Sequence, residues 1–227
     1  MYNEQNNNSE FTKAIQGKRV IFVGPSRTLT GSRKAKWINS FDFVVRTNGA
    51  FPVSENNKPD FGWKCDGMYV NASYARMVHP LPVEEYEKLG VKFLSFKAGI
   101  PKEPDLLNYN RHLMVRSFLY SGQELKSKVK GLLSGSAILN DILKYKPKEF
   151  WVTGLDFYMS GQWHWQRNYI DNYLPEKTLK QAQAQLEKGG LIGHDIESNK
   201  KYMVGLYKAG KIKLDDDILK ILGLYRN

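Results

Sequence analysis

The chain has 227 residues, 41% of them hydrophobic, and its 34 Lys and Arg outnumber 23 Asp and Glu to give a formal charge of +11. This composition is typical of a globular protein and excludes wholesale disorder, and the absence of any run of roughly 20 apolar residues argues against a membrane span. The basic excess favours a polyanionic partner such as nucleic acid, an acidic glycan or a membrane surface, although solubility alone would also explain it.

The first ten residues, MYNEQNNNSE, are polar and rich in Asn, and they predict a flexible tail over 1–16 ahead of a single domain over 17–227. This start lacks the basic segment and apolar run of a signal peptide. The one cysteine, Cys65, cannot form an internal disulfide and is expected to be a small buried side chain. These features together predict a cytoplasmic protein.

Short apolar runs predict the strands of a sheet. The runs lie at 20–23, 41–45, 67–70, 91–95 and 150–154. Apolar residues at helical spacing over 134–145 predict a helix before the last strand, and further helices are predicted over 179–187 and through 208. The run Asp215 to Asp217 is expected to cap a C-terminal helix. Uniformly apolar strands that alternate with helices indicate a single-domain α/β fold with a mainly parallel, Rossmann-like sheet flanked by helices.

The first predicted strand ends on Gly24, Pro25 and Ser26, a sequence that would let backbone amides approach an anion closely. It is not a P-loop, because no Gly-Lys-Ser/Thr follows, and it lacks two glycines of the dinucleotide fingerprint. A tight turn without a ligand would look the same. Ligands of parallel sheets bind beyond the carboxyl ends of the strands, where Asn71 and 154–156 also fall.

The segment from Gly24 to Asn48 is similar to the large sialyl motif of the family 29 glycosyltransferases, the sialyltransferases. Nine residues match it in register, namely Gly24, Ser26, Leu29, Ser32, Ile38, Asp42, Val44, Arg46 and Asn48. The chain departs from the motif at Pro25, Arg27, Ala35 and Asn39, where the family has Asn, Gly, Gly and Asp. The family's two motif cysteines are also absent, which fits a cytoplasmic member.

Five later segments resemble further motifs of the same family, in the same order. Residues 63–71 resemble a stretch in which an Asp opens a strand that ends on Asn, and 133–137 with 150–157 are similar to the small sialyl motif. The sequence Gln-Trp-His-Trp at 162–165 resembles the third motif. Residues 193–197 resemble the very short motif, a His with a downstream Glu, although Glu197 lies closer to His194 than is usual.

The resemblance implies a sialyltransferase-like variant of the GT-A fold and an inverting, metal-independent transfer from a CMP-linked sugar, with no cofactor and no metal site. It makes His194 the general base and His164 the donor of a proton to the leaving phosphate, roles that suit imidazole near neutral pH. Asp42 and Arg46 are expected to form a structural ion pair. The residues implied in donor binding are Gly24, Pro25, Ser26, Arg27, Asn48, Asn71, Ser134, Gly135, Ser136, Gly154, Leu155 and Asp156.

The sequence leaves the sugar and the acceptor open. Leu133 stands where the family begins the loop that contacts the carboxylate of sialic acid, so another donor sugar is an alternative. The charge favours a hydroxymethylated base in duplex DNA, as in bacteriophage DNA modification, with the base turned out of the stack. Its contacts would be Arg33, Lys34, Lys36, Trp163 and Trp165. The alternatives are a glycan or glycolipid acceptor and, from another class, a non-catalytic module that binds nucleotide or nucleic acid.

Overall fold

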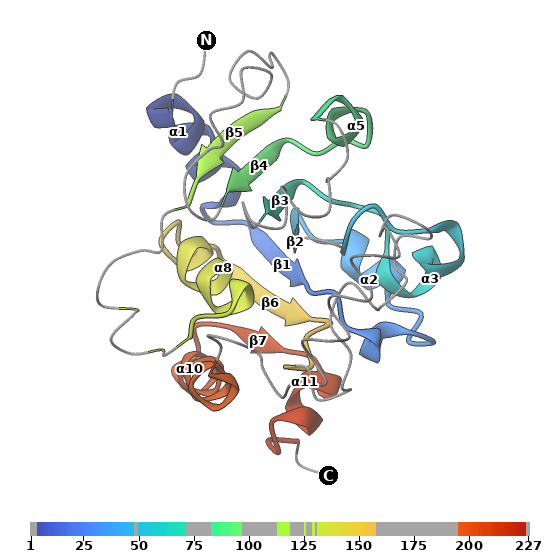
Figure 1. Cartoon of the computed structure of the whole chain (residues 1–227), viewed down its shortest axis with the longest axis vertical. Helices are drawn as coiled ribbons and strands as arrows, with labels where there is room; N and C mark the ends of the chain where they lie inside the picture. The colour runs from blue at the N-terminus through green and yellow to red at the C-terminus, as the bar shows by residue number, and fades with distance from the viewer. Residues whose placement is uncertain are drawn as a thin grey trace, which may run out of the picture.

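The structure, a computed structural model, describes residues 4–47, 50–70, 83–96, 113–118, 125, 129, 131–157 and 195–225. Within them seven strands, all paired in parallel, form one sheet in the order β5-β4-β3-β2-β1-β6-β7 (Figure 1). The strands are β1 (Arg19–Val23), β2 (Phe43–Thr47), β3 (Gly67–Val70), β4 (Phe93–Phe96), β5 (Met114–Ser117), β6 (Glu149–Thr153) and β7 (Lys213–Leu214). The predicted α/β fold with a parallel sheet flanked by helices is confirmed.

Helices cover both faces of this sheet (Figure 1). On one face lie α1 (Glu4–Ile15), α8 (Ser134–Leu143) and α10 (Ile196–Lys208), and on the other α2 (Ala35–Asn39), α3 (Lys58–Phe61) and α5 (Val83–Lys88). Strand side chains alternate between the two cores, so that Val20 and Phe22 pack on the first face and Ile21 and Val23 on the second. The helix α11 (Asp216–Ile221) follows β7 and adds Ile218 to the first core. Among the described helices, none is long and apolar enough to cross a bilayer.

The N-terminal segment is a helix, so the prediction of a flexible tail over 1–16 is wrong for its described part, residues 4–16. Phe11 and Ile15 of α1 are fully buried, and the Phe11 ring packs edge-on against Phe93 with centroids 5.0 Å apart. Two apolar residues four positions apart lie on one face of a helix. Their burial is enough to hold a helix whose average composition is polar.

A buried ion pair on β5 ties α1 and α8 to the sheet. Arg116 is 1% exposed, and its guanidinium donates to Asp141 Oδ2 at 2.7 Å, to the Tyr145 hydroxyl at 2.6 Å and to Asn8 Oδ1 at 3.0 Å. The Tyr69 hydroxyl donates to the same Asp141 oxygen at 2.7 Å. An arginine can occupy an inner position of a strand here because its partners satisfy the charge. The sequence analysis did not predict this strand or β7.

The other predicted elements differ from the structure mainly at their ends. The strand predicted over 41–45 begins at Phe43, and the one predicted over 91–95 spans Phe93–Phe96. Phe41 and Val91 are buried in the turns before these strands, so the apolar runs begin earlier than the strands do. Cys65 is buried and free, as expected. The helix predicted over 179–187 lies outside the described residues.

Candidate functional site

Two loops meet at the carboxyl edge of the sheet, where the central strands β1 and β6 end. The amide of Gly24 donates to the carbonyl of Thr153 at 2.9 Å, and the amide of Ser26 donates to the carbonyl of Gly154 at 2.8 Å. These two bonds continue the β1–β6 pairing past the strand ends. They bring the predicted segments 24–26 and 154–156 together.

Glycine is required on both sides of this contact. An ideal Cβ on Gly24 would lie 2.4 Å from the Gly154 carbonyl oxygen, and one on Gly154 would lie 2.7 Å from the Gly24 carbonyl oxygen. Gly154 also has a φ of +67°, in the left-handed region that favours glycine. The close approach of the two backbones therefore explains why a glycine directly follows each of the two strands.

A third loop, which leads into α8, approaches through the side chain of Leu155. Leu155 Cδ2 lies 2.3 Å from the ideal Cβ position of Gly24, and Leu155 Cδ1 lies 3.6 Å from that of Gly135. The loops 24–26, 134–136 and 154–156, which the sequence places far apart, thus converge around one leucine. We call this convergence the three-loop site.

The start of α8 offers open backbone donors at this site. Its N-cap, Leu133, has no side chain that could accept from the first turn. Within the described structure, the amides of Ser134, Gly135 and Ser136 donate to no acceptor. Unpaired amides at the positive end of a helix dipole are a binding arrangement for an anion.

The expected amide cradle at Gly24-Pro25-Ser26 is wrong. The amides of Gly24 and Ser26 both donate to carbonyls at the end of β6 and in the loop that follows it, and proline has no N–H. No backbone amide of these three residues is therefore available to an anion. Ser26 is fully buried, and its Oγ accepts from the amide of Thr28 at 3.2 Å. Pro25 is half-buried and Arg27 is exposed, so these two residues remain accessible.

The β6 loop is conformationally constrained beyond Gly154. Phe157 has a φ of +50°, which is rare for a bulky residue and costs on the order of 1–3 kcal/mol. Its ring is buried in the core, and Asp156 beside it is 4% exposed. The core thus holds the turn that carries Leu155 in one conformation.

The start of α10 is fastened to the segment before α8. Asn199, which is fully buried, accepts from the Leu133 amide at 3.0 Å and donates to the Gly131 carbonyl at 3.1 Å. Asp195 caps the helix by accepting from the Ser198 amide at 2.9 Å. Asp195 directly follows His194 in the sequence. The sequence analysis did not identify Asn199, because an asparagine inside a predicted helix gives no signal of its own.

A second polar cluster joins the end of β7 to the loop after β1. Lys34 Nζ donates to Asp215 Oδ2 at 2.8 Å and to Asp217 Oδ2 at 2.7 Å, and the Thr153 hydroxyl also donates to Asp215 Oδ2. Asp215 caps α11 by accepting from the Ile218 amide at 3.0 Å, which confirms the predicted cap. Burial lowers the pKa of Lys34, but the two carboxylates raise it further, so the net shift is upward.

This cluster corrects one part of the predicted polyanion contact. The charge of Lys34 is engaged by two carboxylates and is not available to a phosphate. Arg33 and Lys36 are exposed, and the Arg33 amide donates to Asp60 Oδ1 at 2.9 Å. Six other predicted site residues lie outside the described residues, namely Asn48, Asn71, Trp163, His164, Trp165 and His194.

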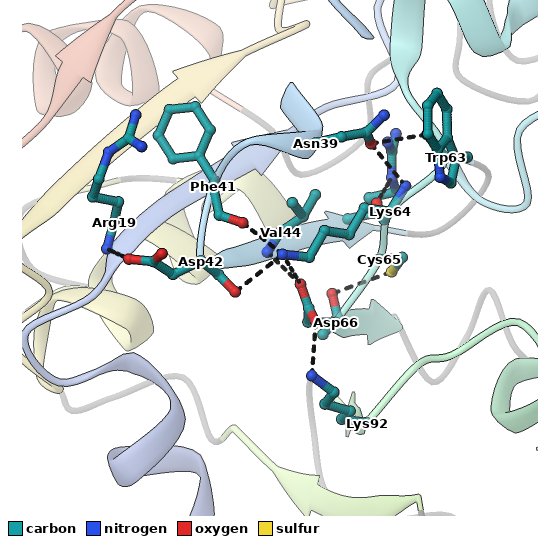
Figure 2. A network of polar contacts seen from close by, with 12 residues as sticks. Arg19, Asn39, Phe41, Asp42, Val44, Trp63, Lys64, Cys65, Asp66 and Lys92 are labelled. Atoms are coloured by element: carbon teal, nitrogen blue, oxygen red, sulfur yellow. Dashed lines mark hydrogen bonds and ion pairs between the residues drawn. The ribbon is translucent and has the colours of Figure 1, made fainter. Parts of the chain in front are cut away.

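The expected ion pair between Asp42 and Arg46 is also wrong. Arg46 donates to the backbone carbonyls of Lys64 and Phe61 at 2.9 and 2.7 Å. Asp42 instead accepts from the Arg19 amide at 2.8 Å, as Figure 2 shows. Four residues along an extended chain separate the two side chains by roughly 13 Å, too far for an ion pair. Burial lowers the pKa of Arg46 to about 10.

Among the described residues, no group of three or more His, Cys, Asp or Glu side chains is placed to hold a metal ion.

No protein-family model and no curated protein matches the chain. Several solved structures do match it. A mammalian sialyltransferase is 15% identical with a TM-score of 0.53, and the match covers 94% of this chain and 79% of that one.

Two further matches are similar in extent. The sialyltransferase CstII from Campylobacter jejuni, in complex with the substrate analogue CMP-3FNeuAc, is 18% identical with a TM-score of 0.57, over 92% of this chain and 89% of that one. A variant of the sialyltransferase CST-II in complex with CMP is 17% identical with a TM-score of 0.55, over 87% and 80%. At this identity the likeness shows that the chain has the fold of these sialyltransferases.

Proposed function

We propose that this chain is a glycosyltransferase that moves a sugar from a CMP-linked donor to an acceptor hydroxyl. The observation that carries the proposal is the three-loop site, which lies at the carboxyl edge of a sheet with the fold of solved sialyltransferases. Two of those structures hold CMP or a CMP-sugar analogue. The same three loops resemble the large and small sialyl motifs.

The donor would place an anionic group at the start of α8. The open amides of Ser134, Gly135 and Ser136 suit a phosphate or a sugar carboxylate, and Gly135 allows close approach because no side chain stands there. Pro25 and Arg27 would lie against the same ligand from the loop after β1. In this role Arg27 would supply the side-chain charge that the family's glycine lacks.

The transfer would need one base and one acid. We assign His194 to remove the proton of the acceptor hydroxyl as its oxygen attacks the anomeric carbon, while the bond from that carbon to the phosphate oxygen breaks. The departing phosphate would take a proton from His164, and the configuration would invert. Support for His194 comes from its neighbour Asp195, which Gly131 and the α10 cap hold beside the start of α8. We propose that no metal takes part.

The acceptor is a separate proposal. A hydroxymethylated base in duplex DNA would retain Arg33 and Lys36 as phosphate contacts but lose Lys34, which is bonded to Asp215 and Asp217. The solved structures name no DNA acceptor. A glycan or glycolipid is therefore the acceptor to test beside DNA, in a cytoplasmic setting that the single cysteine favours.

A thermal-shift panel tests the donor class. CMP and CDP are expected to raise the melting temperature, and UDP and adenosylmethionine are not. Replacing Gly135 by Asp adds a negative charge at the positive end of α8, which favours the helix but repels an anion. We expect the melting temperature of this variant to be maintained and its response to CMP to be lost, whereas Gly135→Asn, of the same shape without the charge, keeps most of the response.

The enzyme and the non-catalytic alternative differ in one variant. His194→Ala should keep the shift with CMP and lose both sugar transfer and hydrolysis of a CMP-sugar. Stabilisation by UDP or adenosylmethionine in place of CMP would overturn the donor class. Stabilisation by CMP with no turnover by the unaltered chain, on glycan, glycolipid or DNA acceptors, would favour a binding module.

A further inference from the structure

The amino edge of the sheet, opposite the three-loop site, is strongly basic. The segments that lead into β1, β2, β3, β4, β6 and β7 are 16–19, 40–42, 62–66, 89–92, 144–149 and 209–213. They contain nine basic residues against three acidic ones, Asp42, Asp66 and Glu149. Because all seven strands are parallel, these segments lie at one edge of the sheet.

Contacts join one half of this edge from β1 to β4 (Figure 2). The Arg19 amide donates to Asp42 Oδ2 at 2.8 Å, and Lys64 and Lys92 both pair with Asp66, at 3.4 and 3.2 Å. Asp66 is 4% exposed, and it also accepts from the Val44 amide. One buried carboxylate thus serves two lysines and leaves a net positive charge.

The other half of the edge runs from β1 to β7. The Lys148 amide donates to the Lys18 carbonyl at 2.8 Å, which places the turn before β6 against the turn before β1. Glu149 is shared by Arg19 at 3.8 Å and Lys213 at 3.2 Å. Four further lysines, Lys18, Lys146, Lys148 and Lys211, are exposed and have no acidic partner in the described structure.

Exposed apolar side chains stand within the same edge. Trp63, in the segment before β3, is 57% exposed, and Leu89, before β4, is 44% exposed. They are two of the three large hydrophobic side chains that are exposed in the described part of the chain. The two side chains stand in the segments that precede β3 and β4, which are paired neighbours in the sheet about 4.8 Å apart, so both belong to one part of this basic edge.

The carboxyl edge has the opposite character. Its described segments, 24–34, 50–60, 131–136, 154–157, 195–197 and 215–217, hold four basic residues and eight acidic ones. The positive charge of the described structure is therefore concentrated away from the three-loop site. Among the described segments, those at the amino edge would therefore attract an anionic surface more strongly than those at the carboxyl edge.

We infer that the amino edge binds an anionic membrane surface. Lysines attract the anionic headgroups, and Trp63 and Leu89 enter the interfacial region, where tryptophan and leucine are favoured. A nucleic acid fits less well, because leucine can neither hydrogen-bond a base nor stack on it. Bound this way, the sheet stands on its amino edge and the three-loop site faces solvent, about 15 Å from the surface across the strands. The inference rests on this edge and not on the proposed function.

Co-flotation of the full chain with lipid vesicles tests the inference. We expect binding to vesicles that contain phosphatidylserine, weak binding to phosphatidylcholine alone, and a fall in binding at high salt. Replacing Lys146 and Lys148 by Glu should lower the partition coefficient onto these vesicles roughly 30-fold or more. The factor follows from about 1 kcal/mol of binding free energy for each lysine near an anionic surface. Lys201→Glu with Lys220→Glu makes the same change in net charge on exposed positions of α10 and α11, and is expected to have a much smaller effect.

A second pair of variants separates insertion from charge. Trp63→Ser with Leu89→Ser should abolish the binding that persists at high salt and leave the low-salt binding largely intact. The inference is overturned if vesicles with phosphatidylserine are not bound, or if the two charge-reversed pairs lose binding equally. It is also overturned if duplex DNA displaces the vesicles and loses affinity in the Lys146 and Lys148 variant.

Discussion

Substitution of Gly24 by Ala gives the sharpest test of the three-loop site. The new Cβ would lie 2.3 Å from Leu155 Cδ2 and 2.4 Å from the Gly154 carbonyl oxygen. The leucine can rotate, but the carbonyl belongs to the backbone and is held by the bond from the Ser26 amide at 2.8 Å. The two loops must therefore separate by about 1 Å to reach an ordinary contact of roughly 3.4 Å.

The cost follows from these contacts. Overpacking in a buried site costs about 1–3 kcal/mol, and a separation of this size weakens two hydrogen bonds that contribute about 1 kcal/mol each. We expect Gly24→Ala to lower the free energy of unfolding by about 2–4 kcal/mol. That is less than the whole stability of a typical domain, so the variant should still fold. It should lose its response to CMP, because the separated loops no longer form the three-loop site.

Urea unfolding of matched glycine variants provides the assay. Gly135→Ala should leave stability nearly unchanged, because its Cβ would meet Leu155 and Phe22 at 3.6 and 3.7 Å, which are ordinary contacts. Gly205→Ala in α10, with nothing within 4 Å, should stabilise by up to about 1 kcal/mol. Adding Leu155→Ala to Gly24→Ala removes only the side-chain contact. Full recovery of stability in that double variant would refute the role assigned to the backbone carbonyl.

Three further predictions concern ionisable side chains. Arg116→Met leaves Asp141 buried without its guanidinium, and should lower the free energy of urea unfolding by about 3–5 kcal/mol; an unchanged value would contradict the ion pair. Burial raises the pKa of Cys65 to about 12, so at about pH 8 a thiol reagent should label it only after urea unfolding, and rapid labelling of the folded chain would disprove this. The raised pKa of Lys34 stabilises the fold below the ordinary lysine pKa of 10.5, and this contribution is lost as pH rises through the folded value. Lys34→Met should lower stability at neutral pH and show a smaller further loss in alkaline urea titrations; identical pH profiles would contradict it.

The strands were predictable wherever both faces of the sheet are buried. Such strands read as continuous apolar runs, and all five predicted runs overlap strands that have a neighbour on both sides in the sheet. β5 was missed because Arg116 interrupts its run, and its charge is satisfied by partners on other elements. α1 was missed because its polar average hides Phe11 and Ile15. Local composition cannot report partners that are distant in the sequence.

The candidate site also has a part that local sequence patterns identify and a part that depends on tertiary contacts. Gly24 and Gly154 were identified because each follows an apolar run, but their mutual contact depends on the pairing of β1 with β6, which no local pattern shows. The loss of Lys34 as a free charge depends on Asp215, which the sequence presents only as a helix cap. Sequence patterns therefore located the loops, and the tertiary pairings decided which of their groups are available to a ligand.

The Asp215 cluster explains how a two-residue strand at the sheet edge can matter to the three-loop site. β7 alone adds little pairing, but Asp215 at its end bonds the Thr153 hydroxyl, one residue before Gly154, and the Lys34 ammonium, at the end of the loop that begins with Gly24. Both loops that meet at Leu155 are thus fastened to the start of α11. A change of Asp215 to Ala would release Thr153 and Lys34 together, so its effect on the Gly24–Gly154 contact should exceed that of Lys34→Met, which leaves the Thr153 bond in place.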